Sequence, residues 1–338
     1  MSVYLGSIKI GDSINKDENK LLEIISGTVE TLTSNDLKDT IIIKDNFFVG
    51  CNNLTDIQLP DTITTIQDYA FKGCEKLENV KMSESINTLG WQCFYGCTNL
   101  KNINLPEGLT EIQNNCFSSC ESLEEVVLPS TLTTLASNSF SYCSKLKSIN
   151  IPSNIVQLED YTFTNCTLLE NIILHDDITT LGDQVFSNCE NLKKINLSPN
   201  MTSIGSRCFW GCTKLETINF SDSITSFGEG VCAYCSSLKN VHIPSEITSI
   251  LRETFESCIS LESITIPSKV TTIEMNSLAR CENLKEVIVE AISPPTLHSY
   301  AFNGTTPNII YVPNGSLSAY QSASNWSKFA DKIVEMEG

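Results

Sequence analysis

The chain has 338 residues, of which 22 are basic and 40 acidic, so its formal net charge is −18. Apolar residues make up 41% and charged residues 18%, which is too apolar for a disordered chain and sufficient for a large core. The negative charge repels phosphate and argues against general binding of nucleic acid or anionic membranes. No run of about 18 apolar residues occurs, so membrane insertion is not expected.

The first 27 residues differ from the rest of the chain. Two short strands around Gly6-Ser7 are predicted from the apolar residues Val3, Leu5, Ile8 and Ile10. No basic start precedes an apolar stretch, so we expect no Sec-type signal peptide. The opening Val-Tyr-Leu-Gly-Ser-Ile-Lys-Ile resembles the short leaders of some phage and prophage tail-associated proteins. That resemblance implies that residues 1–27 attach the chain to something larger; a simple N-terminal cap is the alternative.

The middle of the chain is a repeat of 23 residues, marked by eleven cysteines without an insertion between them. These are Cys51, Cys74, Cys97, Cys120, Cys143, Cys166, Cys189, Cys212, Cys235, Cys258 and Cys281. Counted from each cysteine, Leu is at +3, Ile or Val at +6 and an apolar residue at +8. Pro is frequent at +9, apolar residues occupy +12 and +15, and Phe dominates +20. A fixed period in this range is the signature of a solenoid.

The repeat has a direct physical interpretation. The apolar residues at +6 and +8 have the two-residue spacing of a strand, and the following Pro ends the strand because it lacks an N–H. The second half returns the chain to the same level one layer further on. Like positions then stack in columns, and the stack buries a core that one repeat cannot bury alone.

This unit resembles the BspA-like class of leucine-rich repeats. The resemblance implies an α/β-type leucine-rich-repeat solenoid: a right-handed superhelix with a concave parallel β-sheet and short turns or helical segments on the convex side. It covers eleven repeats at 51–289 and extends through a partial repeat at 28–50, where Ile43 and Phe48 fall at +15 and +20. It also implies a C-terminal cap at 290–338. Family use implies adhesion, host-surface contact or general protein binding.

Within the cap, residues 316–333 predict one or two short helices. The apolar residues at near-helical spacing are Tyr320, Trp326, Phe329 and Ile333.

Four further cysteines lie outside the main series. Cys93, Cys116 and Cys208 are at +19, a position of small residues, and Cys232 replaces Phe at +20. A zinc site would need four converging ligands, and a disulfide ladder would need specific geometry for an odd total of fifteen cysteines. We therefore predict buried thiols in a protein that folds in a reducing compartment, with no metal and no cofactor.

Two columns of side chains are expected to point out of the sheet. Position +4 alternates between Glu and Lys from Glu78 to Lys285, which predicts opposite charges side by side on neighbouring strands. Position +7 is rich in Asn, whose amide donates and accepts hydrogen bonds and suits carbohydrate or peptide backbone. The candidate partner-binding residues of this column are Asn104, Asn150, Asn196, Asn219 and His242. An Asn ladder that bonds to itself between strands is the open alternative.

Aromatic residues gather instead near the core Phe. Trp210 and Tyr234, at +21 and +22, fall in successive layers and are predicted to adjoin. Exposed Trp and Tyr are good interface anchors, so we add both to the candidate partner-binding residues. The alternative is that they cover the outer edge of the core.

The sequence offers little for catalysis. It has three histidines and none of the G-x-S-x-G, H-E-x-x-H, Walker or G-x-G-x-x-G motifs. We expect no Asp, Ser or Cys near His242 in its outward column, so it is interpreted as an isolated surface histidine. The prediction is a non-enzymatic module, displayed on a virion or cell surface, that contacts a host protein or glycan. An intracellular, cytoplasmic scaffold that binds a protein partner is the alternative.

Overall fold

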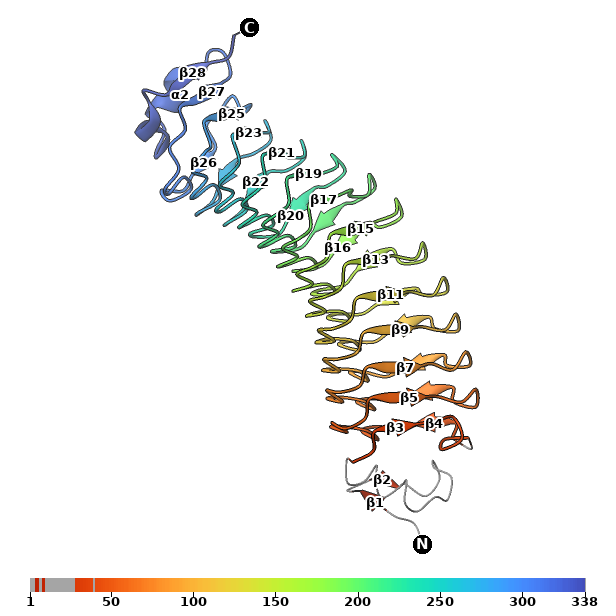
Figure 1. Ribbon diagram of the computed structural model, residues 1–338. Coiled ribbons are helices and arrows are strands. Elements are labelled where there is room, and N and C mark those ends of the chain that lie inside the picture. The colour runs from red at the N-terminus through yellow and green to blue at the C-terminus, as the bar shows by residue number, and fades with distance from the viewer. Residues whose placement is uncertain (1–3, 6–7, 10–27, 39, 338) are drawn as a thin grey trace. The chain divides into compact units, whose positions relative to one another are not determined.

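The computed structural model describes residues 4–5, 8–9, 28–38 and 40–337, and the chain divides into two units, Met1–Ile172 and Ile173–Gly338. In the repeats of both units each turn of chain has a first short strand, a corner, a second strand of two residues and a run of tight turns (Figure 1). We call the strands that contain position +6, or its equivalent in the cap, the first column, and those that contain +15 the second column. This is the predicted stack of parallel-strand turns.

The role predicted for residues 1–27, attachment or capping, falls largely outside the described residues. The structure places β1 (Tyr4–Leu5) and β2 (Ile8–Lys9) there, paired antiparallel as the two predicted short strands.

The first unit stacks both columns in register. Its first-column strands are β3 (Thr31–Leu32), β5 (Asp56–Gln58), β7 (Asn79–Lys81), β9 (Asn102–Asn104), β11 (Glu125–Val127), β13 (Ser148–Asn150) and β15 (Asn171–Ile173), which reaches the boundary. Its second-column strands are β4 (Ile42–Ile43), β6 (Thr65–Ile66), β8 (Thr88–Leu89), β10 (Glu111–Ile112), β12 (Thr134–Leu135) and β14 (Gln157–Leu158). Pairing is parallel and joins like positions, as in Val80↔Ile103 and Val126↔Ile149.

The second unit follows the same plan and ends in the cap. Its first-column strands are β17 (Lys194–Ile195), β19 (Thr217–Asn219), β21 (Asn240–His242), β23 (Ser263–Ile266), β25 (Glu286–Val289), β27 (Ile309–Val312) and β28 (Ile333–Glu335). Its second-column strands are β16 (Thr180–Leu181), β18 (Ser203–Ile204), β20 (Ser226–Phe227), β22 (Ser249–Ile250), β24 (Thr272–Ile273) and β26 (Thr296–Leu297). The paired strands of this unit are again parallel.

Hydrogen bonding explains the cysteine column. Cys143 Sγ lies 3.2 Å from the backbone oxygen of Phe117, and Cys212 Sγ lies 3.2 Å from that of Phe186. Each of these thiols thus donates to the carbonyl of the residue three positions before the preceding cysteine of the series, a buried acceptor that an aliphatic side chain would leave without this donor. All fifteen cysteines are free and buried, as predicted.

The side opposite the first column consists of turns, and the helical segments that were expected as an alternative are absent from residues 40–316. The reason is a left-handed backbone at +18 and +22 of every repeat from that of Cys51 to that of Cys258, which interrupts any helix. Gly fills some of these positions, but Tyr, Asn, Gln, Arg, Glu and Ser fill others, for example Tyr69, Gln92, Arg207 and Tyr234.

The cap contains α2 (Leu317–Ser322) and the 3₁₀ helix η2 (Trp326–Phe329), which match the short helices predicted for this segment. The prediction was wrong for Ile333, which begins β28 and pairs with Ile310, because the free edge of β27 offers backbone partners. Tyr320 Oη donates to Ala291 O at 2.6 Å, and both ends of this contact are buried.

Candidate binding surface on the first-column strands

The first-column strands present alternate side chains to solvent. In β9 and β19 the central Ile is buried and both flanking residues are exposed, as the two-residue period of a strand requires. We call the surface formed by the exposed side chains of these strands the strand face. The candidate residues Asn104, Asn150, Asn196, Asn219 and His242 are all exposed on it.

The Asn side chains do not form the ladder considered above. In the first unit, exposed Val127 separates Asn104 from Asn150. In the second unit, Asn196 and Asn219 occupy neighbouring layers without an amide–amide hydrogen bond between them. Within the described residues these four amides have no side-chain hydrogen bond, so each keeps its donors and acceptor available to a ligand.

The charged column at +4 forms pairs. Lys101 Nζ lies 2.6 Å from Glu78 Oε2, and Lys147 Nζ lies 2.9 Å from Glu124 Oε2. These two Glu side chains thus contact the Lys of the next layer, while Lys101 and Glu124 form no ion pair in the described part of the chain. The predicted contact between opposite charges is therefore observed as two separate pairs in the first unit.

A groove of about 500 Å³ lies on the strand face of the second unit. Asn219, His242 and Thr265, the +7 residues of successive layers, line it together with Asp222 and Glu290. The full lining is Thr217, Asn219, Asp222, Asn240, Val241, His242, Ile243, Ser245, Thr265, Pro267 and Glu290. We call this the polar groove; its size is within the range of small-ligand sites, about 300–1,000 Å³.

His242 is not the isolated histidine that the sequence predicted. Its Nε2 lies 3.1 Å from Asp222 Oδ1, which also accepts a hydrogen bond of 3.0 Å from the backbone N–H of Ser245. The Ser245 N–H, and next the His242 ring, lower the pKa of the Asp222 carboxyl below its usual value. Asp222 is at +10 of the preceding repeat, in the turn after β19, so a search confined to the outward strand columns misses it.

The Asp222–His242 pair fixes the orientation of the imidazole ring. Within the described residues the other ring nitrogen, Nδ1, has no hydrogen bond to a hydroxyl or thiol, and no cysteine lines the groove. The described groove residues thus offer hydrogen-bond donors and acceptors, with the ring of His242 held by Asp222.

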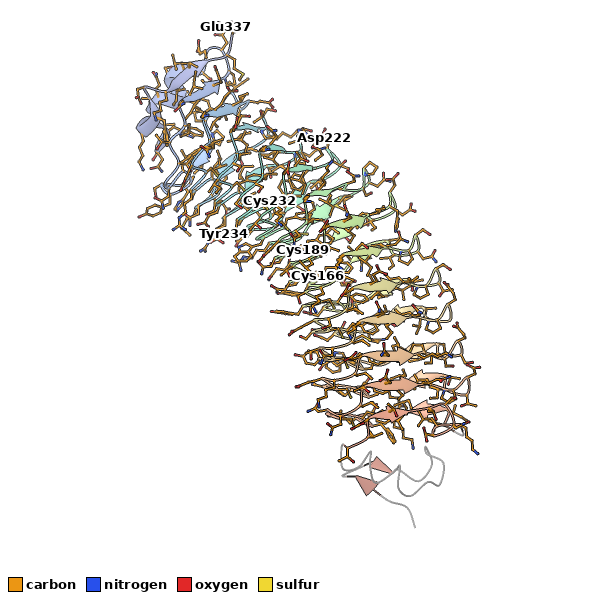
Figure 2. The ribbon with its side chains drawn as sticks, in the orientation of Figure 1. Cys166, Cys189, Asp222, Cys232, Tyr234 and Glu337 are labelled. Carbon is orange, nitrogen blue, oxygen red and sulfur yellow. The ribbon has the colours of Figure 1, made fainter. Side chains whose placement is uncertain are left out.

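The aromatic candidates form a second surface. The rings of Trp210 and Tyr234 adjoin as predicted, with centroids 5.1 Å apart and planes tilted by 56°. Figure 2 shows Asp222 and Tyr234 at opposite edges of the stacked layers, with Cys232 between them. The seven candidate residues therefore do not converge on one site.

A similar aromatic cluster lies in the first unit. Tyr69 and Trp91 have ring centroids 5.7 Å apart. The ammonium group of Lys72 lies 4.9 Å from the Tyr69 centroid and 5.1 Å from that of Tyr95. The rings of Tyr69 and Tyr95 thus share one cation.

Comparison with known proteins bears on both fold and family. The sequence matches the model of the BspA type leucine rich repeat region in overlapping stretches at 41–170, 110–239, 156–285 and 215–328. A crystal structure of a leucine-rich repeat protein from Bacteroides ovatus is 26% identical, with a TM-score of 0.66, over 99% of this chain and 98% of that one. One from Eubacterium ventriosum is 21% identical, with a TM-score of 0.57, over 82% and 83%, and shows the fold alone.

Comparison with curated proteins gives no match. Among the described residues, none of the helices has the length and apolar character needed to cross a bilayer.

Proposed function

Since this chain belongs to the family of BspA-type leucine-rich repeat proteins, we propose that it is a non-enzymatic binding module that contacts a protein or glycan through the polar groove. The observation that carries the proposal is the combination, in one groove, of an unengaged Asn219 amide and a His242 ring held by Asp222. The contact with Asp222 orients the His242 ring before any ligand arrives, which reduces the entropy lost on binding.

We propose further that the module is displayed on a virion or cell surface, where its partner belongs to a host. The resemblance of the first residues to tail-associated leaders and the use of the family in adhesion support this placement. A specific observation favours the alternative, an intracellular scaffold for a protein partner: all fifteen cysteines are free thiols, as in proteins of reducing compartments. Virion proteins fold in such a compartment before release, so the thiols are compatible with either placement.

Binding of the labelled full-length chain to a glycan array and to a panel of cell surfaces tests the module. We expect the double variant Asn219→Ala, His242→Ala to lose about tenfold or more in affinity, because both lose groups that face the groove. The matched control is Asn104→Ala, Asn150→Ala, which removes the same kind of exposed amide from the first unit and should bind like the unmodified chain. Equal binding by both double variants, or none by the unmodified chain, would contradict the proposal.

The location is tested separately on native material. An antibody against the repeat array should detect the protein in purified virions or on intact cells. Detection confined to the soluble cytosol would support the scaffold instead.

A further inference from the structure

The +7 column changes character at the end of the second unit. Thr265 pairs with Ile288, Ile288 with Tyr311, and Tyr311 with Val334, so this column continues through β27 and β28 of the cap. Its members are polar at 219, 242 and 265 and apolar at 288, 311 and 334. We call Ile288, Tyr311 and Val334 the apolar strip; all three side chains are half-buried on the strand face.

The apolar strip is the floor of a second groove, of about 660 Å³. Met336 adds to the apolar lining, and Glu286, Glu335 and Glu337 complete it. We call this the C-terminal groove. Its lining differs from that of the polar groove, in which the +7 residues are Asn, His and Thr.

The charge of the C-terminal groove is one-sided. Three carboxylates line it and no lysine or arginine does; Lys332, close by in sequence, is outside the lining. Glu335 Oε1 accepts hydrogen bonds from the backbone N–H groups of Gly315 at 2.8 Å and Leu317 at 3.3 Å, so its side chain is held in place. Glu286 and Glu337 form no ion pair in the described part of the chain, so their charges are not neutralised internally.

Carboxylates around an apolar floor select one class of occupant. Lys and Arg combine an aliphatic stem with a charged head, and a neighbouring aliphatic side chain would bury apolar surface on the strip. The exposed face of Tyr311 adds a ring for a cation–π contact. A neutral glycan would leave the carboxylates without compensating charge, and an acidic segment would be repelled.

We propose that the C-terminal groove binds a polypeptide segment of a protein partner in which an aliphatic side chain lies next to lysine or arginine. The proposal rests on the proposed function and sharpens it, because it names a cationic protein segment, rather than a glycan, as ligand of the strand face. Three neighbouring strands spaced by about 4.8 Å make the strip about 10 Å long, the reach of about three extended residues. The recognised segment is therefore short.

A labelled twelve-residue peptide with Lys-Leu-Lys at the centre of a Gly-Ser background provides the probe. Fluorescence anisotropy with the full-length chain should show saturable binding that weakens as salt rises from about 0.05 to about 0.3 M. Peptides with Glu-Leu-Glu or Lys-Gly-Lys at the centre should bind about tenfold more weakly, the first through repulsion and the second through the lost aliphatic contact.

Two variants locate the site. Glu286→Gln and Tyr311→Ala should each weaken binding of the Lys-Leu-Lys peptide by about fivefold or more. Glu262→Gln is the matched control, since Glu262 is an exposed carboxylate of the preceding layer outside the groove lining. Circular dichroism checks that each variant is folded; Glu286→Gln removes only charge and keeps the test informative if Tyr311→Ala unfolds.

Absence of peptide binding, or equal binding by Glu286→Gln and Glu262→Gln, would overturn the inference. The proposed function has a separate readout, the loss of surface or glycan binding by Asn219→Ala, His242→Ala. If the peptide fails while that loss is observed, the inference falls and the proposed function stands. If the peptide binds at Glu286 and the polar-groove variant has no effect, the strand face binds through the C-terminal groove alone.

Discussion

The two units are built from the same repeat but differ in regularity. In the first unit Phe rings from Phe48 to Phe163 form one stack, with centroids of successive rings 4.9–5.9 Å apart and planes within 14° of parallel. In the second unit the stack includes Phe186 and Phe209, whose centroids are 5.6 Å apart, and then meets Cys232. Leu278 interrupts the column a second time, after Phe255.

Other residues of the same repeat compensate for the ring that is missing at Cys232. Phe220 at +8 and Phe227 at +15 replace the smaller aliphatic residues of other layers, and their centroids are 4.6 Å apart. The layer thus has a smaller side chain at +20 and larger ones at +8 and +15, so its total apolar volume is maintained. A core tolerates such an exchange when total volume is conserved. The same layer carries Asn219 and Asp222 of the polar groove. The altered core thus occurs in the layer that carries part of the candidate site.

Truncating one ring in each unit gives the largest expected effect. Phe117→Ala should lower the free energy of unfolding by about 3–5 kcal/mol through lost burial and a cavity. Phe117 also stacks on a ring at each side, and each such pair contributes about 0.5–1.5 kcal/mol. Phe255→Ala should cost less, because Phe255 lies between Cys232 and Leu278 and has no ring contact in the described residues.

Urea unfolding of the full-length chain, followed by circular dichroism, measures both losses. A smaller loss for Phe117→Ala than for Phe255→Ala would show that the ring stack adds nothing beyond its buried area. Phe209→Ala should give an intermediate value, because Phe209 stacks on Phe186 on one side and is followed in the column by Cys232 on the other.

Much of the fold could be predicted because it repeats. A period of 23 residues fixes which side chains share a column, so the parallel strands, the buried Leu, Ile and Phe columns and the buried thiols follow from one unit. Ile333 was misplaced because its helical spacing from Phe329 is a local signal, whereas its strand partner Ile310 lies 23 residues away in a segment without the cysteine marker. Pairing to an open sheet edge overrode the local pattern.

The candidate residues could be predicted less completely. The outward direction of Asn219 and His242 follows from the strand period, but Asp222 comes from a turn of the preceding layer, outside any strand column. The C-terminal groove escaped notice because Tyr311, Val334 and Glu337 belong to the cap, where repeat numbering stops. If the 23-residue period is continued past Cys281, Tyr311 and Val334 fall at position +7.

High pH should affect both units alike, since they contain eight and seven of the fifteen buried thiols. Burial raises the pKa of Cys51 from 9.0 to about 11 and that of Cys166 from 9.0 to about 12. In the unfolded chain these thiols ionise near pH 9, whereas the folded chain keeps them protonated. Their contribution to stability is therefore complete below pH 9 and is lost as the pH rises toward 12.

The urea midpoint of unfolding should accordingly fall steadily above pH 9, and thiols of both units should contribute to the fall. A thiol-specific reagent at pH 8 should modify the folded protein slowly, beginning at Cys51, which is 4% exposed. Rapid modification of all cysteines without denaturant would contradict the buried thiol column.

The smallest expected effect concerns the charged column. Glu124→Lys removes the ion pair with Lys147 and places like charges side by side, whereas Glu216→Lys changes a residue that forms no ion pair with Lys239 in the described residues. The first variant should therefore be slightly less stable than the second in low salt, and the difference should shrink as salt rises.

The pH dependence of that difference identifies its origin. The hydrogen bond and charge of Lys147 lower the pKa of the Glu124 carboxyl from 4.5, so the pair stabilises the fold above that pH and loses its effect as the pH falls through the lowered value. The two variants should then unfold at closer urea midpoints in acid than at pH 7. A difference that persists in acid and in high salt would come from packing of the longer Lys side chain. In that case the alternation of Glu and Lys would reflect side-chain fit between layers more than charge.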